Sequence, residues 1–176
     1  MLEKPNFYSV IIGTELLNGR RKDAHFAFIN QQLLSRGWEQ KASFVINDDT
    51  NLMENIFNLI KNDPNSVMFC FGGIGATPDD YTRVVAGKVF TSGAMEFHEE
   101  AKNRIINQFG EEAYPHRINM AYLPINAKLL KNVINNVAGF YLEDRFFFTP
   151  GFPSMSQAMV IEALDKLYLK SDIQKY

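Results

Sequence analysis

The feature that most constrains the fold is an apolar segment that ends abruptly in a glycine-rich loop. Residues 67–71 (VMFCF) form a wholly apolar run of strand length, which is typical of a strand buried on both faces of a sheet. Residues 72–80 (GGIGATPDD) follow at once, and a helical pattern begins at Tyr81. A buried strand, a glycine loop and a helix in this order predict an α/β protein whose loop can approach a ligand closely.

The segments before this motif already alternate between strand and helix. Short β-rich runs predict strands over residues 7–12 and 38–46. Helical spacing of apolar residues predicts a helix between Asp23, as its N-cap, and Gly37, and another over residues 52–60. Alternating strands and helices are the signature of a mostly parallel sheet with helices on its faces.

The second half of the chain is less regular. We predict, in order, a helix over residues 96–109, strands over residues 140–142 and 146–149, and a last helix from Ser154, as its cap, to Tyr168. Residues 110–136 show no clear period, because Pro115 and Pro124 interrupt it.

The composition excludes several classes of partner. The chain carries 18 Lys and Arg against 20 Asp and Glu, a formal net charge of −2, so it offers no basic excess for nucleic-acid phosphates. Its single cysteine, Cys70, excludes an intramolecular disulfide and a cysteine-rich zinc site. No apolar run suits a signal peptide or a membrane helix. We expect one domain over residues 1–176, in the cytoplasm, with no nucleic-acid or membrane partner.

The glycine loop has the composition of a phosphate site that needs a cation. Consecutive glycine amides can surround phosphate oxygens, yet the loop lacks the lysine of a Walker P-loop and carries Asp79 and Asp80 instead. Carboxylates beside a phosphate repel it unless a divalent cation intervenes, and Mg²⁺ binds through one or two carboxylates plus phosphate oxygens. The alternative is a plain helix start, with Asp79 or Asp80 as its N-cap.

Two further loops should lie at the same edge of the sheet, because parallel strands end there together. Residues 47–50 (NDDT) offer Asp48, for which helix capping is the alternative role, and residues 13–19 (GTELLNG) offer Glu15, for which a surface turn is the alternative. Residues 150–154 (PGFPS) form a rigid turn that either presents amides to an anion or is a structural corner.

These loops together resemble a known family. Residues 72–83 (GGIGATPDDYTR) resemble the G-G-[IL]-G-P-T-x-D-D-x-T signature of the CinA family, which belongs to the molybdopterin-binding superfamily with MogA, MoaB and the front domain of eukaryotic FAD synthase. Further CinA-like segments occur in order along the chain, at residues 13–20, 48–49, 117–124, 132–140 and 150–155. The chain is therefore similar to the molybdopterin-binding domain of CinA proteins over most of its length.

The resemblance implies a fold and a choice of activities. The fold is a three-layer α/β/α domain that binds a molybdopterin-like or adenine-nucleotide ligand at the carboxyl edge of its sheet. CinA-type members imply metal-dependent hydrolysis of a nucleotide pyrophosphate such as ADP-ribose, and the FAD synthase relative implies hydrolysis of FAD. MogA-type members imply adenylylation of molybdopterin with ATP and Mg²⁺. A module that binds a pterin or nucleotide without turnover is a third possibility.

The resemblance also assigns residues to these roles. Asp48 and Asp80 carry over as the catalytic acids, and with Asp79 they form the expected metal ligands. The expected ligand and phosphate contacts are Gly13, Glu15, Gly72, Gly73, Gly75, Thr77, Thr82, Gly151, Pro153 and Ser154. Relatives form dimers or trimers, so a homo-oligomer is also expected.

The chain departs from the family pattern in places. Ala76 replaces the usual proline of the glycine loop, and His25 stands where CinA proteins commonly carry Asn in a D-x-N motif. From its local sequence alone, His25 is predicted to be a surface or helix residue. Full-length CinA proteins often add a C-terminal amidohydrolase domain. We expect it to be absent from a chain of 176 residues.

Overall fold

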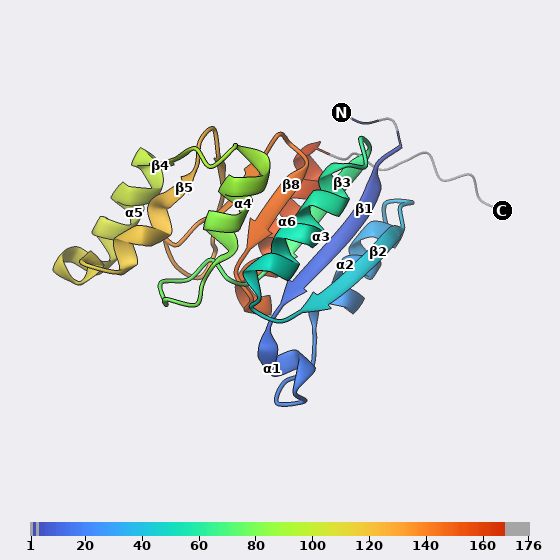
Figure 1. Ribbon diagram of the computed structural model, residues 1–176, viewed down its shortest axis with the longest axis horizontal. Coiled ribbons are helices and arrows are strands. Elements are labelled where there is room, and N and C mark those ends of the chain that lie inside the picture. The colour runs from blue at the N-terminus through green and yellow to red at the C-terminus, as the bar shows by residue number, and fades with distance from the viewer. Residues whose placement is uncertain (1, 3, 168–176) are drawn as a thin grey trace.

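A six-stranded sheet runs through the centre of the computed structural model, which describes residues 2 and 4–167 (Figure 1). Its strand order is β2–β1–β3–β8–β7–β6. The strands are β1 (Asn6–Ile12), β2 (Gln40–Ile46), β3 (Ser66–Phe71), β6 (Lys128–Leu130), β7 (Gly139–Leu142) and β8 (Phe146–Thr149). The strands predicted at residues 7–12, 38–46, 67–71, 140–142 and 146–149 are confirmed to within two residues, and β6 lies in the stretch that had no clear period.

The first four strands of that order are parallel. β1 pairs in parallel with both β2 and β3, and β3 pairs in parallel with β8. Only β7 and β6 run antiparallel to their neighbours. The loops that follow β1, β2, β3 and β8 therefore leave the sheet at one edge, which is where ligands bind in open sheets of this kind.

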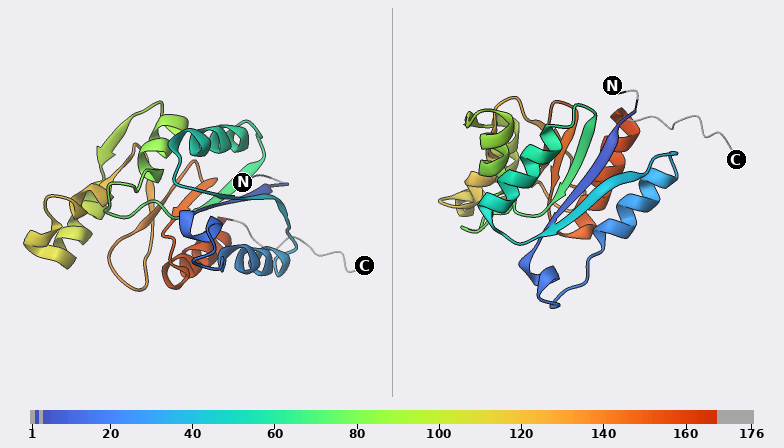
Figure 2. Two further views of the ribbon diagram at one scale, coloured as in Figure 1. Left: turned by 60° about the horizontal axis from the view of Figure 1, so that its bottom comes forward. Right: turned by 45° about the vertical axis from the view of Figure 1, so that its right-hand side comes forward.

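Helices cover both faces of the sheet, as Figure 2 shows. α3 (Thr50–Lys61) and α4 (Thr82–Phe90) pack on one face, and α2 (His25–Leu34) and α6 (Pro153–Leu167) pack on the other. Successive side chains of β3 alternate between the two cores: Met68 packs toward α3 and α4, and Phe69 packs toward α2 and α6. The three-layer α/β/α arrangement expected from the sequence is thus the observed one.

Local signals set most helix ends. The Asp23 carboxylate accepts hydrogen bonds from the backbone N–H of His25 and Phe26, so it caps α2 as predicted. Gly37 has φ of +79° just beyond the last turn, in the left-handed region that suits glycine. The prediction that Ser154 caps the last helix is wrong, because α6 begins at Pro153 and Ser154 lies in its first turn. The predicted end at Tyr168 is outside the described residues.

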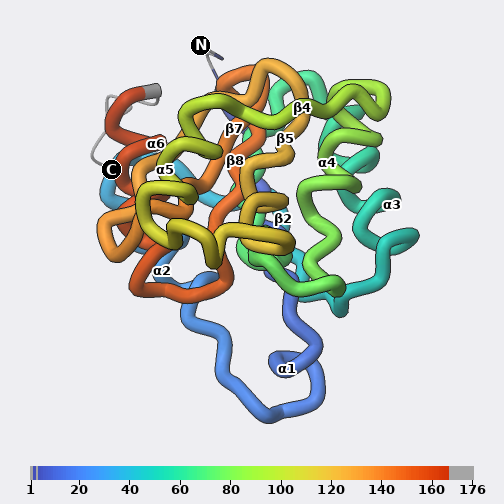
Figure 3. The backbone as a smooth tube through the Cα atoms, turned by 90° about the vertical axis from the view of Figure 1, so that its left-hand side faces the viewer, coloured from blue at the N-terminus to red at the C-terminus, as the bar shows by residue number. Residues whose placement is uncertain are grey.

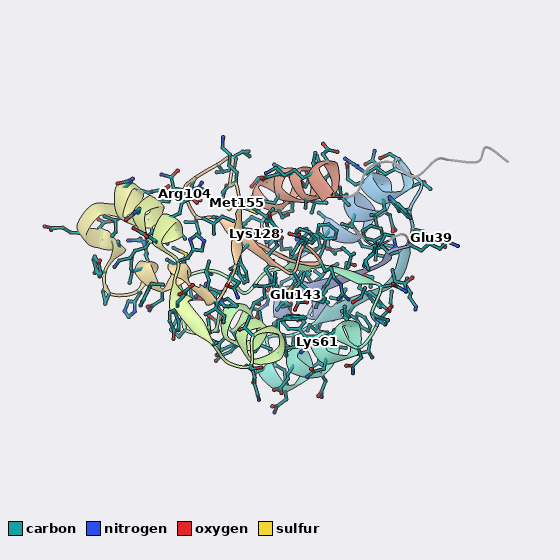
Figure 4. All side chains as sticks on the ribbon, turned by 90° about the horizontal axis from the view of Figure 1, so that it is seen from above. Glu39, Lys61, Arg104, Lys128, Glu143 and Met155 are labelled. Carbon is teal, nitrogen blue, oxygen red and sulfur yellow. The ribbon has the colours of Figure 1, made fainter. Side chains whose placement is uncertain are left out.

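A small lobe extends from one end of the sheet. It contains β4 (Met95–Phe97), α5 (Glu99–Phe109), two 3-10 turns at Gly110–Ala113 and Arg117–Ala121, and β5 (Tyr122–Pro124). The labelled Arg104 of this lobe and Glu39 near β2 lie at opposite ends of the long axis (Figure 4). The predicted helix start at residue 96 is wrong, because residues 95–97 pair antiparallel with β5 and the His98 side chain then caps α5.

The segment after β1 leaves the body of the molecule and returns (Figure 3). It carries a one-turn helix, α1 (Thr14–Leu17), where the sequence suggested only a turn. Among the described helices, none is both long enough and apolar enough to cross a membrane.

Candidate functional site

Four loops converge on one pocket at the carboxyl edge of the sheet. The pocket has a volume of about 380 Å³, and it is lined by residues that follow β1, β2, β3 and β8. Ten of the residues expected from the sequence to hold a ligand or metal line it: Gly13, Glu15, Asp48, Gly72, Gly73, Gly75, Thr77, Asp79, Asp80 and Gly151. Parallel strand ends explain this convergence of segments that lie far apart in the chain.

Three of the expected contact residues lie elsewhere. Thr82 is fully buried, and its hydroxyl donates to the Gly72 carbonyl at 2.9 Å, so it braces the glycine loop from within and is not available to a ligand. Pro153 lines a small neighbouring cavity with Glu15 and His25. Ser154 is exposed in the first turn of α6 and is not among the residues that line the main pocket.

Close packing explains the glycines of the loop. Gly72 and Gly73 have φ of +103° and +73°, which side chains rarely adopt. A Cβ atom on Gly73 would lie 2.1 Å from the Thr82 Oγ1, and one on Gly75 would lie 2.7 Å from the Asp80 Oδ2. The loop can fold around its own threonine and aspartate only with glycine at these positions.

The expectation that three glycine amides bind phosphate needs one correction. The Gly72 N–H donates to the Thr149 carbonyl at 2.9 Å, which extends the pairing of β3 with β8, so this amide is already used. Within the described chain, no backbone or side-chain acceptor takes the N–H of Gly73 or Gly75. Two amides of the loop therefore remain for an anion.

The acids of the glycine loop form a turn closed by Thr77. The Asp80 Oδ2 accepts a hydrogen bond from the Thr77 N–H at 2.9 Å, and the Thr77 Oγ1 lies 2.6 Å from both Asp80 Oδ2 and Asp79 Oδ1. The hydroxyl contact lowers the pKa of Asp79 below its ordinary value. No side chain caps the first turn of α4, so the alternative role of Asp79 or Asp80 as a helix cap is wrong.

The acids of the loop after β2 divide their tasks. The Asp49 carboxylate accepts from the N–H groups of Asn51 and Leu52 and caps α3. Asp48 is half-buried in the pocket wall, where its Oδ2 accepts from the Thr14 hydroxyl at 2.9 Å. Helix capping, the alternative role for this turn, is therefore correct for Asp49, whereas Asp48 faces the pocket.

A buried arginine supports the glycine loop and was missed from the sequence. The Arg83 side chain donates to the carbonyls of Ile74 and Gly75 at 2.5 and 2.8 Å. Burial lowers the pKa of Arg83, and the charge of Asp80 opposes that shift. Arg83 thus places a positive charge behind the loop whose amides face the pocket. The only signal for it was an arginine next to the last threonine of the motif.

His25 holds the turn before α6. The prediction of a surface or helix residue is confirmed for the helix, but the side chain is buried and not at the surface. His25 is the first residue of α2, is only 4% exposed, and stacks on Phe71 with ring centroids 4.3 Å apart. Its Nε2 lies 2.9 Å from the Gly151 carbonyl oxygen. Because a carbonyl oxygen only accepts hydrogen bonds, Nε2 carries a proton and donates it in this contact. Burial lowers the pKa of His25, with the Gly151 carbonyl opposing the shift, so the ring is neutral near pH 7.

The pocket's donor set suits a hard cation bound together with phosphate. Asp48 and Asp80 are half-buried carboxylates from separate loops, and Arg21 is the only cationic side chain that lines this pocket in the described structure. Within residues 2 and 4–167, no three acidic, histidine or cysteine side chains gather into a metal cage. Mg²⁺ usually takes one or two carboxylates and completes its shell with water and phosphate oxygens, so the two acids fit that mode of binding.

Comparison with known proteins shows the family of the chain. A family model described as "Probable molybdopterin binding domain" matches residues 9–169. A CinA-like protein of Geotalea uraniireducens is 33% identical over 161 residues, which cover 87% of this chain and 37% of that protein. A protein of Pyrococcus abyssi is 29% identical, with 94% and 71% covered. The chain thus spans well under half of the CinA-like relative.

Solved structures give the same picture. CinA of Thermoplasma acidophilum, a protein of unknown function, superposes with a TM-score of 0.81 at 25% identity, covering 93% of this chain and 97% of that one. The molybdopterin biosynthesis enzyme MoaB of Thermus thermophilus superposes with a TM-score of 0.56 at 14% identity, covering 96% and 92%. At that identity the likeness to MoaB concerns the fold alone.

Proposed function

This chain belongs to the family of MoaB/Mog-type molybdopterin-binding domains, and we propose that it acts within that family as a CinA-type hydrolase. Its substrate would be a nucleotide pyrophosphate such as ADP-ribose, and its cofactor a divalent cation such as Mg²⁺. Water would attack one phosphorus, the bridging P–O bond would break, and ADP-ribose would yield AMP and ribose 5-phosphate.

One observation carries the proposal: two half-buried acids from separate loops share a pocket with glycine residues, and no lysine of the described residues lines it. Amides at positions 73 and 75 bind phosphate oxygens without adding a full charge. Four acids of the same pocket would repel a pyrophosphate on their own: Glu15, Asp48, Asp79 and Asp80. A bound cation removes that conflict, and this combination is the usual setting of metal-assisted phosphate chemistry.

Each residue of the pocket then has a defined task. Asp48 and Asp80 hold the cation, which when bound neutralises phosphate charge and polarises the reacting phosphoryl group. Thr77 orients the Asp80 carboxylate through its N–H and hydroxyl, and Thr14 orients Asp48 through its hydroxyl. Asp80 also positions the attacking water and accepts its proton. Arg83 holds the carbonyls of Ile74 and Gly75, and so fixes the loop whose Gly73 and Gly75 amides would bind the phosphate oxygens.

The test is turnover of ADP-ribose and of FAD with Mg²⁺, Mn²⁺ or Co²⁺, following AMP release. We expect metal-dependent AMP that disappears with EDTA, returns when metal is restored, and is lost in Asp80→Asn although the variant melts as the wild type does.

Absence of AMP with every metal would overturn the hydrolase proposal for these substrates. If the same protein then transferred AMP from ATP to molybdopterin, it would be an adenylyltransferase. Ligand binding without either product would identify a binding module.

A further inference from the structure

A large apolar side chain stands exposed at the rim of this polar pocket. Phe152 lines the pocket and is 59% exposed. The other large apolar side chains of the wall, Ile12 and Ile74, are buried at 6% and 4% exposure and belong to the core. Phe152 is therefore the one large apolar surface that the described pocket offers to a ligand.

The backbone that carries Phe152 is fixed from three sides. The carbonyl of Gly151, one residue before it, accepts from His25 Nε2 at 2.9 Å, and the Gly151 backbone packs against Gly72 of the glycine loop. The Phe152 carbonyl accepts from the N–H groups of Met155 and Ser156. A fixed backbone that carries a largely exposed ring is the arrangement of a preformed contact surface, because little conformational entropy is lost when a ligand covers it.

Arg21 lies over one face of this ring. Its guanidinium carbon is 5.6 Å from the Phe152 ring centroid, and its Nη1 is 3.7 Å from Glu15 Oε1. Both Arg21 and Phe152 line the pocket, so a flat apolar surface and a positive charge lie together on the same wall. Aromatic rings stack on phenylalanine, and guanidinium groups pair with phosphates.

We propose that Phe152 is a stacking platform for the planar ring of the ligand, a purine or a pterin, with Arg21 beside it as a phosphate contact. This inference rests on the proposed ligand class and deepens it, because it makes the pocket selective for phosphates that carry an aromatic ring. The ring would lie on Phe152 while the phosphates reach the amides of Gly73 and Gly75. A phosphorylated sugar without a base would lack the first of these contacts.

The test is a binding measurement with two ligands that differ only in the ring. AMP and ribose 5-phosphate share the ribose and the phosphate, and neither contains a pyrophosphate to cleave. Calorimetry with Mg²⁺ is compared for the wild type, Phe152→Ala and Phe152→Trp. Phe97→Ala is the matched control, because Phe97 is also an exposed phenylalanine, at 49%, but lies on β4 and is not among the residues that line the pocket.

We expect Phe152→Ala to weaken AMP binding about 5- to 150-fold, the usual range for a lost base stack. Binding of ribose 5-phosphate should stay within about twofold. Phe152→Trp should retain AMP binding, and Phe97→Ala should leave the binding of both ligands unchanged.

Equal effects of Phe152→Ala on the two ligands, or no effect on AMP, would overturn the platform, as would a wild-type protein that binds no ring-bearing phosphate. Because binding is read without turnover, failure of the hydrolase proposal and failure of the platform give different results. If no AMP is released but Phe152→Ala still weakens AMP binding more than ribose 5-phosphate binding, only the hydrolase proposal is contradicted.

Discussion

The two acidic turns of the pocket look alike in sequence and are built differently. Residues 47–50 (NDDT) separate their tasks, because Asp49 caps a helix while Asp48 faces the pocket. Residues 77–80 (TPDD) close on themselves, because both acids contact Thr77 and both line the pocket. In the first turn the acid that accepts the N–H groups of a helix is structural and the other acid faces the pocket, whereas in the second turn Asp80 accepts a backbone N–H and also lines the pocket.

This difference has a consequence for function. The carboxylate of Asp80 both shapes its turn and faces the ligand, whereas the shape of the other turn depends on Asp49 and not on Asp48. Chemistry and structure should therefore be separable by mutating residue 48 or residue 49, whereas at residue 80 only a substitution that keeps the hydrogen-bond acceptor, such as Asn, should separate them.

The largest effect should follow from Asp80→Asn. The amide oxygen can still accept from Thr77, so the turn is kept while the charge is lost. We expect kcat/KM for ADP-ribose to fall by about 100-fold or more, the size of a lost acid–base or metal-holding group. Asp79→Asn is the control, since Asp79 is exposed, and it should cost about fivefold at most. Equal losses in the two variants would contradict the assignment of Asp80.

The next effect should come from the arginine behind the glycine loop. Arg83→Met leaves the carbonyls of Ile74 and Gly75 without their donor, so we expect the free energy of unfolding to fall by about 2 kcal/mol. Lys88→Met in the same helix removes only an exposed ion pair with Glu54 and should change it by less than about 1 kcal/mol. Urea unfolding of the two variants measures the contrast. Similar midpoints would show that Arg83 does not support the loop.

The architecture could be read from the sequence because its signals are local. Apolar runs at residues 7–12 and 67–71 gave the central strands, and Asp23 and Gly37 gave the ends of α2. The lobe could not be read in this way. β4 has three residues and exists because it pairs with β5, more than 20 positions later, and no local pattern records such a pairing.

The site shows the same division. Its acids and glycines were identifiable because they cluster in loops whose residue types imply a chemistry. The two supporting residues were not, because each acts on a backbone carbonyl. His25 holds Gly151, 126 residues away, and Arg83 holds carbonyls that any sequence would supply. Every residue has a backbone carbonyl, so the sequence does not indicate which residue such a side chain will contact.

A smaller effect should separate the two members of the first doublet. Asp48→Ala should lower kcat/KM about tenfold and leave stability nearly unchanged, because Asp48 accepts only one side-chain hydrogen bond from the described chain. Asp49→Ala should do the opposite and lower the free energy of unfolding by about 1 kcal/mol through loss of the α3 cap. Thermal melts and AMP release on the same samples measure both. If both variants changed kcat/KM and stability to the same extent, the proposed division of tasks between Asp48 and Asp49 would be wrong.

The smallest effect should come from the hydroxyls that contact these acids. Thr77→Val removes a donor shared by Asp79 and Asp80, while Thr14→Val removes the donor to Asp48. We expect about threefold lower kcat/KM in each, within the range of one hydrogen bond. Only Thr77→Val should move the titration of Asp79, followed by carboxyl NMR, and the direction is upward, because the Thr77 hydroxyl is what lowers that pKa. An unchanged Asp79 titration in Thr77→Val would show that the turn is not closed by its threonine.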